Sequence, residues 1–219
     1  MICEQLKKVK NNLPENVCLI AVSKTKPVSD LQEAYHCGQL HFGENKVQEM
    51  CDKAEQLPSD IHWHLIGHLQ TNKVKYIAPF VDLIHSVDSL KLLQEINKQA
   101  EKNNRIIRVL LQFHIAEEET KFGLDLEEAT ALLESDSFSA CKNIDVCGVM
   151  GMASFVENEE QVRSEFRQLK SIFNQLKEQY FADKASFSEI SMGMSGDYQL
   201  AIEEGSTMVR IGSTIFGGR

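Results

Sequence analysis

The sequence predicts an α/β fold, a single (β/α)8 TIM barrel, and three observations favour it. Short apolar runs of strand length alternate with longer stretches in which apolar residues recur at helical spacing. Eight such runs are present, which is the number of strands in a closed parallel barrel. Polar or small residues follow several of the runs. Because 219 residues fall short of the roughly 250 typical of this fold, an open doubly wound sheet is the alternative.

Most of the predicted strands are followed by a stretch with helical periodicity, which is the order of a repeated strand–helix unit. An amphipathic segment opens the chain, and clear apolar faces recur in 45–57 and 159–180. Glycine and proline act only as punctuation and no linker divides the chain, so we expect residues 1–219 to form one domain. The predicted strands lie at 17–23, 40–44, 61–67, 82–88, 105–113, 144–153, 187–193 and 208–216.

Composition limits the classes of function. The formal net charge of −9 would repel a phosphate backbone, and no basic stripe offsets it. No run of about 18 apolar residues exists to span a bilayer, and the first residues lack the features of a signal peptide. We therefore expect a cytoplasmic protein whose partners are small molecules, with neither nucleic acid nor membrane among them.

The cysteines are scattered, and no CxxC motif is present. Several fall on apolar positions, where a reduced thiol packs as a small hydrophobe. We therefore expect neither a disulfide nor a cysteine zinc site. The six cysteines are Cys3, Cys18, Cys37, Cys51, Cys141 and Cys147.

Residues that follow the predicted strands matter most, because barrel active sites are built from these loops. Ser195 follows the seventh strand and precedes a short helical stretch, while Gly212 and Ser213 lie at the eighth. Phosphate often binds between the loops after strands seven and eight, so these two segments predict an anion site. The alternative is that Ser195 only caps its helix and Gly212 only turns the chain.

A lysine pair lies at the end of the first predicted strand, in "AVSKTKP". A free lysine, with a pKa near ~10.4, is protonated at neutral pH, but desolvation in a barrel mouth favours the neutral, nucleophilic amine. Such an amine could form a Schiff base with a phosphorylated aldehyde. A solvated structural pair is the other interpretation, and periodicity does not choose between Lys24 and Lys26.

Two weaker candidates remain. His62 and His64 share one face of a strand, as metal ligands can, but no carboxylate is placed beside them in the sequence, so we expect no metal. Asn45 either caps the helix that follows it or reaches into the barrel mouth, and capping is favoured.

Ordered motifs give the chain a family resemblance: "AVSKTKP", "HFGENKVQE", "WHLIGHLQTNK", "ETKFGL", "SMGMSGD" and "STMVRIGSTIFG". From about residue 17 to its end, the chain resembles the pyridoxal phosphate homeostasis proteins, once named as the proline synthetase co-transcribed homologues. That family resembles the barrel domain of alanine racemase. The resemblance implies pyridoxal 5′-phosphate (PLP), a form of vitamin B6, bound covalently. It places the Schiff base on Lys24 rather than Lys26.

The resemblance also assigns the other cofactor-binding residues. It implies a phosphate clamp at Ser195, Gly212 and Ser213, with Arg210 facing the pyridine nitrogen and Asn45 near the ring. The chain departs from the family at two places. It has His114 and the acidic run 117–120 after the fifth strand, where an asparagine is frequent, and Gly196 where an aspartate is common.

We expect a PLP-binding protein that acts in intracellular PLP homeostasis by buffering or delivery, with no residue in a catalytic role. PLP-dependent apoenzymes are the expected recipients, and amino acids are further small-molecule partners. The main alternative is a weak PLP-dependent amino-acid racemase, and a cofactor-free lysine aldolase is a third. Barrel racemases take a second acid/base, a tyrosine, from an additional domain, whereas this chain ends just after the eighth strand. Its own tyrosines, Tyr35, Tyr76, Tyr180 and Tyr198, lie in helical patterns and are expected to pack.

Overall fold

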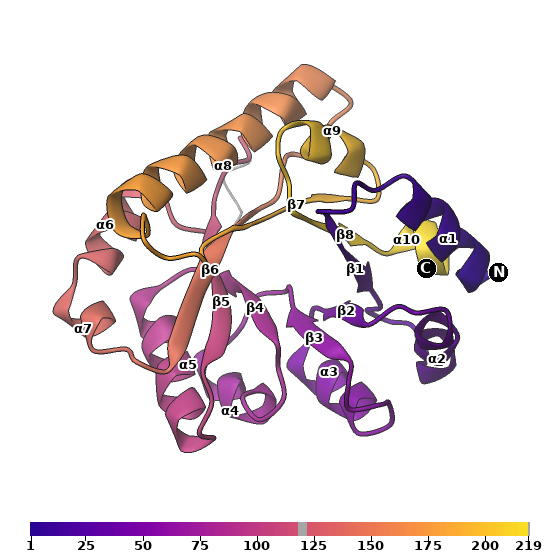
Figure 1. The fold of residues 1–219 in the computed structure, drawn as a ribbon, viewed down its shortest axis with the longest axis horizontal. Helices are drawn as coiled ribbons and strands as arrows, with labels where there is room; N and C mark the ends of the chain where they lie inside the picture. The colour runs from indigo at the N-terminus through magenta and orange to yellow at the C-terminus, as the bar shows by residue number, and fades with distance from the viewer. Residues whose placement is uncertain (118–121, 219) are drawn as a thin grey trace.

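The computed structural model describes residues 1–117 and 122–218 and contains a closed parallel barrel. Its strands pair in the order β1 to β8, and β8 closes on β1 with Cys18 opposite Met208. Helices surround the strands (Figure 1). The barrel prediction is confirmed, and the open sheet is excluded because an open sheet would leave β1 and β8 unpaired.

Each predicted apolar run except the eighth coincides with one strand to within about two residues at either end, because alternating or continuous apolar residues suit the buried strands of a parallel sheet. The eighth run differs most: the run 208–216 is strand only to Ile211, and Ser213–Phe216 forms the short helix α10. The apolar residues of α10 face a helical neighbour, since this helix packs against α1. The strands are β1 Cys18–Val22, β2 His41–Glu44, β3 His62–Leu65, β4 Leu83–Val87, β5 Ile107–Phe113, β6 Ile144–Gly151, β7 Glu189–Met194 and β8 Met208–Ile211.

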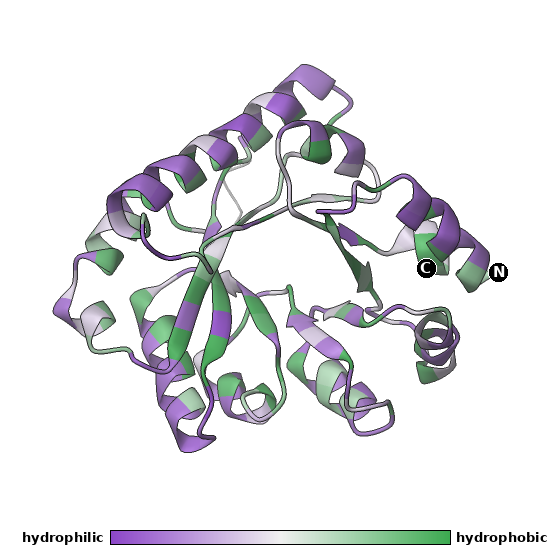
Figure 2. Cartoon of the chain, in the orientation of Figure 1, coloured by the Kyte–Doolittle hydropathy of each residue, from purple (hydrophilic) through white to green (hydrophobic). Residues whose placement is uncertain are grey.

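The helices follow the predicted periodicity, most clearly α8, which spans 159–180 as predicted. They bury one apolar face against the barrel and expose a polar face, as the alternating colours along the helices show (Figure 2). The helices are α1 Ile2–Asn11, α2 Val28–His36, α3 Val47–Ala54, η1 Thr71–Lys73, α4 Val74–Ile77, α5 Leu90–Lys102, α6 Leu126–Leu133, α7 Asp136–Ser139, α8 Glu159–Tyr180, α9 Tyr198–Glu203 and α10 Ser213–Phe216.

The core has an outer and an inner part. The large outer cluster fills the space between strands and helices. A small inner cluster includes Leu83, Leu110 and Met150, while other buried side chains are polar, among them His85 and Arg210. Burying a polar group without a hydrogen-bond partner costs free energy, so the partners of these buried polar side chains, and the function they serve, need to be identified.

One expectation about the cysteines is wrong. Cys3 of α1 and Cys37, just after α2, form a disulfide, with their Cα atoms 5.6 Å apart. The two residues are 34 positions apart in the sequence, and only the packing of α1 on α2 brings them together. No helix among the described residues combines the length and apolar character needed to cross a bilayer.

Candidate active site at the carboxyl mouth of the barrel

A pocket of about 550 Å³ opens at the carboxyl ends of the strands. All six residues predicted to bind the cofactor line it, although they come from four separate places in the chain. Met152 and Phe155, the latter 94% exposed, add an apolar wall, of which the sequence analysis did not predict Phe155. The six residues are Lys24, Asn45, Ser195, Arg210, Gly212 and Ser213.

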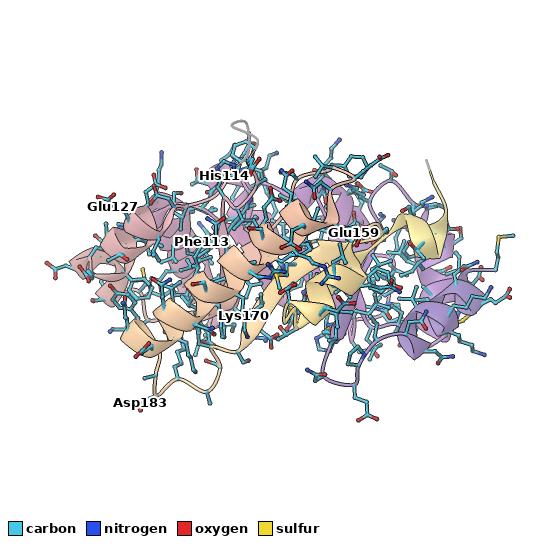
Figure 3. All side chains as sticks on the ribbon, turned by 90° about the horizontal axis from the view of Figure 1, so that it is seen from above. Phe113, His114, Glu127, Glu159, Lys170 and Asp183 are labelled. Atoms are coloured by element: carbon cyan, nitrogen blue, oxygen red, sulfur yellow. A yellow bond between two sulfur atoms is a disulfide. The ribbon has the colours of Figure 1, made fainter. Side chains whose placement is uncertain are left out.

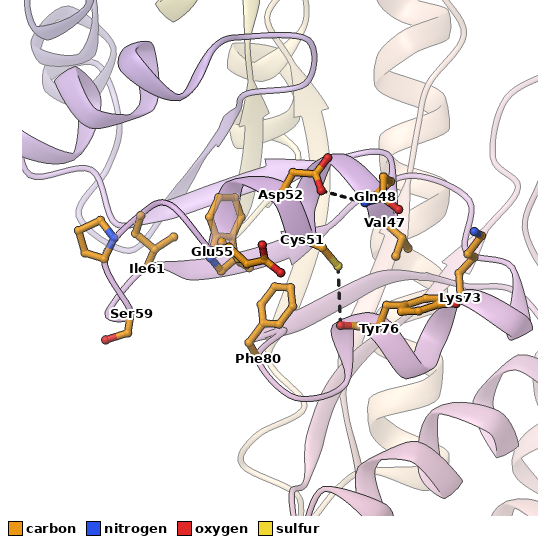
Figure 4. Close-up of a pocket in the computed structure, with 13 residues that line it drawn as sticks. Val47, Gln48, Cys51, Asp52, Glu55, Ser59, Ile61, Lys73, Tyr76 and Phe80 are labelled. Carbon is orange, nitrogen blue, oxygen red and sulfur yellow. Dashed lines mark hydrogen bonds between the residues drawn. The ribbon is translucent and has the colours of Figure 1, made fainter.

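A second pocket, of about 540 Å³, lies outside the barrel between α3 and α4 (Figure 4). Aromatic side chains, including Tyr76 and Phe80, line it, and Cys51 donates a hydrogen bond to the carbonyl of Tyr76 at 3.7 Å. None of the six predicted residues lies there. Size alone therefore does not separate the two pockets, whereas the chemistry of the lining residues does.

The loop after β1 separates the roles of its two lysines. Lys24 lines the carboxyl-mouth pocket. The ammonium of Lys26 instead donates to the carbonyls of Phe216 and Gly218, both at 3.0 Å. Thr25, between them, has φ 65°, which is uncommon for a β-branched residue. Lys24 is thus the amine available to a ligand in this pocket.

Buried charges support this loop from below. The ammonium of Lys53 donates to the carbonyl of Ser23 at 2.8 Å, to Glu44 at 2.7 Å and to Glu49 at 2.8 Å. The Glu49 carboxylate also accepts from the N–H of Thr25 at 2.5 Å. Burial raises the pKa of Glu44, while hydrogen bonds from Lys53 and Ser23 oppose that shift. The network fixes the backbone on both sides of the pocket lysine.

Ser195 and Gly212 converge as predicted, but Ser195 does not cap a helix. The N–H of Gly212 donates to Ser195 Oγ at 3.2 Å, so one hydrogen bond joins the loops after β7 and β8. Helix α9 begins after Asp197, whose carboxylate accepts from the N–H of Met194 at 2.5 Å. A side chain at Gly212 would lie 3.0 Å from the carbonyl oxygen of Val22, which explains the glycine.

The capping prediction for Asn45 is also wrong. The residue that precedes α3 is Lys46, which makes no side-chain cap, and Asn45 lines the pocket instead. A side chain at Gly67 would collide with the backbone of Asn45, so the loop after β3 and the loop after β2 approach closely here. Close packing of the two loops leaves the Asn45 side chain facing the pocket.

Arg210 is buried, with 4% of its surface exposed. Its guanidinium donates to Ser191 Oγ at 2.5 Å and to the carbonyl of Gly151 at 3.1 Å. Burial lowers the pKa of Arg210 to about 10, and the nearby Asp197 carboxylate opposes that shift. A buried side chain that only donates hydrogen bonds can present one of its remaining N–H groups to the pocket.

A row of histidines inside the barrel supports Arg210. His41 Nδ1 lies 3.0 Å from His64 Nε2, and His64 Nδ1 lies 2.9 Å from His85 Nε2. His85 Nδ1 lies 2.9 Å from Ser191 Oγ, the acceptor for Arg210. Burial lowers the pKa of His64 and His85 well below the usual value, so both rings are neutral. We call His41, His64, His85 and Ser191 the imidazole row. In the sequence, these residues are marked only by their positions on the sides of predicted strands that face the inside of the barrel.

The statement that no carboxylate stands beside the histidines of β3 needs correction. Asp82, which immediately precedes β4, lies 3.6 Å from His62 Nδ1 and 4.0 Å from His64 Nε2. Asp82 is 18 residues from His64 in the sequence, and only the parallel pairing of β3 with β4 makes them neighbours.

His114 is not among the residues that line the pocket. His114 follows Phe113 at the end of β5, at the opposite end of the barrel from Asp183 (Figure 3). Most of the acidic run 117–120 lies outside the described residues, so its place relative to the pocket is not described. None of the four tyrosines lines the pocket; the hydroxyl of Tyr35 donates to Asp60 and that of Tyr180 to Glu134.

Known proteins resemble the chain over nearly its whole length. A family model described as the N-terminal domain of alanine racemase matches residues 2–219. A pyridoxal phosphate homeostasis protein of Aquifex aeolicus is 44% identical over 202 residues, which are 92% of this chain and 86% of the relative. The protein of that name in Homo sapiens is 41% identical over 213 residues, 92% of this chain and 76% of the relative.

Solved structures agree with these matches. PipY of Synechococcus elongatus without PLP has a TM-score of 0.92 at 36% identity, covering 99% of this chain and 100% of PipY. The structure of PipY with PLP bound has a TM-score of 0.89 at the same identity and coverage. Alanine racemase of Clostridium difficile has a TM-score of 0.80 at 16% identity, over 100% of this chain and 60% of the racemase, which shows a shared fold alone.

Proposed function

Because the chain belongs to the family of pyridoxal phosphate homeostasis proteins, we propose that it binds PLP in the carboxyl-mouth pocket and acts in PLP homeostasis. The pocket chemistry supports this proposal. Among the described residues that line it, Lys24 is the one amine, and neither histidine, cysteine, tyrosine nor carboxylate accompanies it. One amine is enough to bind an aldehyde covalently, whereas racemisation needs a second acid/base group on the opposite face of the cofactor ring.

Lys24 is the residue to which we assign the covalent link. When bound, PLP supplies an aldehyde that reacts with amines and a ring that withdraws electrons. The Lys24 amine lies in the pocket, whereas Lys26 already donates to two backbone carbonyls. The buried charges under the loop hold the backbone on both sides of Lys24 through Ser23 and Thr25.

Ser195, Gly212 and Ser213 are assigned to the phosphate. Two hydroxyl groups and the N–H groups of two loops meet on this side of the pocket, and the Ser195–Gly212 hydrogen bond shows that the loops are already close. Hydrogen bonds to a charged phosphate are each worth roughly 1.5–3 kcal/mol. Asn45 is assigned to the ring edge.

Arg210 is assigned to the pyridine nitrogen. Its guanidinium has only donors, so it offers no acceptor to a protonated ring nitrogen and favours the unprotonated form. An unprotonated ring withdraws electrons less strongly. With a single amine in the pocket, this arrangement favours holding and delivering PLP over racemisation, which needs a second acid/base group.

We propose further that residues 1–219 act as one unit and that PLP-dependent apoenzymes receive the cofactor. The pocket lies at the open mouth of the barrel, and exposed Phe155 forms part of its rim. A ligand at this position can leave without unfolding of the barrel.

The absorption spectrum of the purified protein mixed with PLP tests the proposal. We expect a visible band of lysine-bound PLP in the wild type and in Lys26→Ala, and its loss in Lys24→Ala while circular dichroism stays unchanged. A lysine aldolase would show no such band. A band that survives in Lys24→Ala would contradict the assignment of the covalent link.

A further inference from the structure

A second cluster of ligating side chains lies at the amino mouth of the barrel, opposite the pocket. One ring nitrogen of His41, one of His62 and a carboxylate oxygen of Asp82 lie within 4.8 Å of one another. His62 Nδ1 is 3.6 Å from Asp82 Oδ2. Tetrahedral zinc holds its ligands at roughly 2.0–2.1 Å, which places ligand atoms about 3.3 Å apart. The His62 ring stacks on the His41 ring, with ring centroids 4.6 Å apart and planes 13° apart, so His62 must rotate out of this stack for the three atoms to surround one ion.

A cation already lies at this cluster. The guanidinium of Arg108 is 3.6 Å from Asp82 Oδ2, so the carboxylate attracts positive charge in the protein as it stands. Arg108 also has a second partner, the thiol of Cys147. The side chains of Arg108 and His62 are 39% and 46% exposed, so an ion can reach Asp82 and Arg108 can move aside.

The imidazole row holds His41 from behind. Metal-binding histidines are commonly oriented by a hydrogen bond at their other ring nitrogen, and His41 Nδ1 has such a partner in buried His64 at 3.0 Å. His64 in turn contacts His85 at 2.9 Å. The ring of His41 is therefore already held in one orientation before any ion arrives.

We propose that His41, His62 and Asp82 bind a divalent transition metal ion of the zinc class, and that the imidazole row connects this site to Arg210. Two imidazole nitrogens with one carboxylate oxygen form a ligand set that zinc, cobalt and nickel accept. Only the second half of the proposal, the connection to Arg210, rests on the proposed function.

The direction of the hydrogen bonds explains the connection. Arg210 can only donate, so Ser191 Oγ accepts from it, and we assign the hydroxyl proton of Ser191 to the contact with His85 Nδ1. His85 then carries its proton on Nε2 and donates to His64. His64 likewise donates from Nε2 to His41 Nδ1. This assignment gives each donor in the row an acceptor.

An ion on His41 is incompatible with that direction. Coordination through Nδ1 occupies the lone pair that accepts from His64. Coordination through Nε2 leaves the proton of the neutral ring on Nδ1, facing the proton of His64. In either case the protons of His64 and His85 must move to their other ring nitrogens. His85 Nδ1 then carries a proton and no longer accepts from the Ser191 hydroxyl, so this hydroxyl, next to Arg210, must turn. The proton count of the row is unchanged when each ring moves its proton from Nε2 to Nδ1.

Titration of the PLP-free protein with Co²⁺ tests the site directly. We expect one Co²⁺ per chain with visible d–d absorption that Zn²⁺ displaces, and affinity lowered more than about tenfold in His62→Ala and in Asp82→Asn. His36→Ala, an exposed histidine elsewhere, is the matched control and should bind like the wild type. Failure to bind, or equal binding by all variants, would overturn the metal site whatever the outcome for PLP.

Titration of the PLP-loaded protein with Zn²⁺ tests the connection. We expect the visible band of the bound cofactor to shift as the ion binds, and the shift to disappear in His85→Gln while Co²⁺ affinity stays within about twofold. Retained Co²⁺ binding also shows that His85→Gln is folded. Ion binding without a spectral shift in the wild type, or a shift that persists in His85→Gln, would overturn the connection.

Discussion

The two sides of the Lys24 pocket are held in different ways. Beneath the lysine, charges hidden from solvent fix the loop: the side chains of Lys53 and Glu44 are 6% and 0% exposed and lie 2.7 Å apart. On the clamp side, one neutral hydrogen bond from Gly212 to the half-buried Ser195 joins two loops. Changes beneath the lysine should therefore affect folding, whereas changes in the clamp should affect ligand affinity.

The largest effect is expected from Lys53→Met. Removing one partner of a buried ion pair leaves Glu44 charged and uncompensated, which typically costs about 3–5 kcal/mol. Urea unfolding should show this loss in the free energy of unfolding. Lys46→Met, in the exposed residue that precedes α3, is the matched control and should stay within about 0.5 kcal/mol of the wild type. If Lys53→Met lowers the free energy of unfolding by less than 1 kcal/mol, the proposed difference between the lysine side and the clamp side of the pocket is wrong.

The cost of Lys53→Met should also depend on pH. The pKa of Glu44 is raised by burial, and losing Lys53 raises it further. A carboxyl whose pKa is higher in the folded state binds more protons when folded, so the stability of the variant falls as pH rises through that pKa. Unfolding at pH 5 and pH 7.5 should show the larger loss at pH 7.5. Equal losses at both values would mean that Glu44 is not the source.

A smaller effect, confined to affinity, is expected from Ser195→Ala. Losing one charge-assisted hydrogen bond of roughly 1.5–3 kcal/mol should weaken PLP binding about 10- to 100-fold. The free energy of unfolding should change by less than about 0.5 kcal/mol. Pyridoxal, which lacks the phosphate, should bind more weakly still to the wild type. Equal affinity for the two ligands would remove the clamp from the account.

The smallest effect is expected in turnover, because neither side of the pocket supplies a second acid/base. Incubation with L-alanine and PLP in deuterated water should show α-proton exchange close to that of free PLP. Turnover at or above about 1 s⁻¹, the lower end of common enzyme rates, would favour the racemase. Chirality and isotope content of the recovered alanine measure the outcome.

Most of the fold could be predicted from the sequence, since apolar periodicity marks strands and helices directly. The eighth run shows the limit: Ser213–Phe216 reads as strand from its apolar residues but forms a helix because it packs on α1. The disulfide between Cys3 and Cys37 was missed for a related reason, since only packing brings two helices from separate segments together.

Lys24, Asn45, Ser195, Gly212 and Ser213 could be placed at the barrel mouth because active sites of this fold are built from the loops after strands. Arg210, which lies within β8, and the choice of Lys24 over Lys26 came from the family resemblance. The residues that hold the pocket residues in place could not be predicted. Lys53 is a charged residue in a predicted amphipathic helix, where a lysine is expected at the surface, although it is only 5% exposed. The imidazole row joins strands far apart in sequence, since His85 and Ser191 are 106 positions apart. Such contacts depend on barrel closure and on side-chain direction, which a single sequence does not contain.

Borohydride reduction of the PLP-loaded protein, followed by peptide mass mapping, tests the central claim most directly. Reduction makes the link between lysine and cofactor permanent, so the modified residue can be located. The account predicts the added mass of the reduced cofactor on Lys24 and none on Lys26. Label on Lys26 or on another lysine, or no label after reduction of a protein that binds PLP, would contradict it.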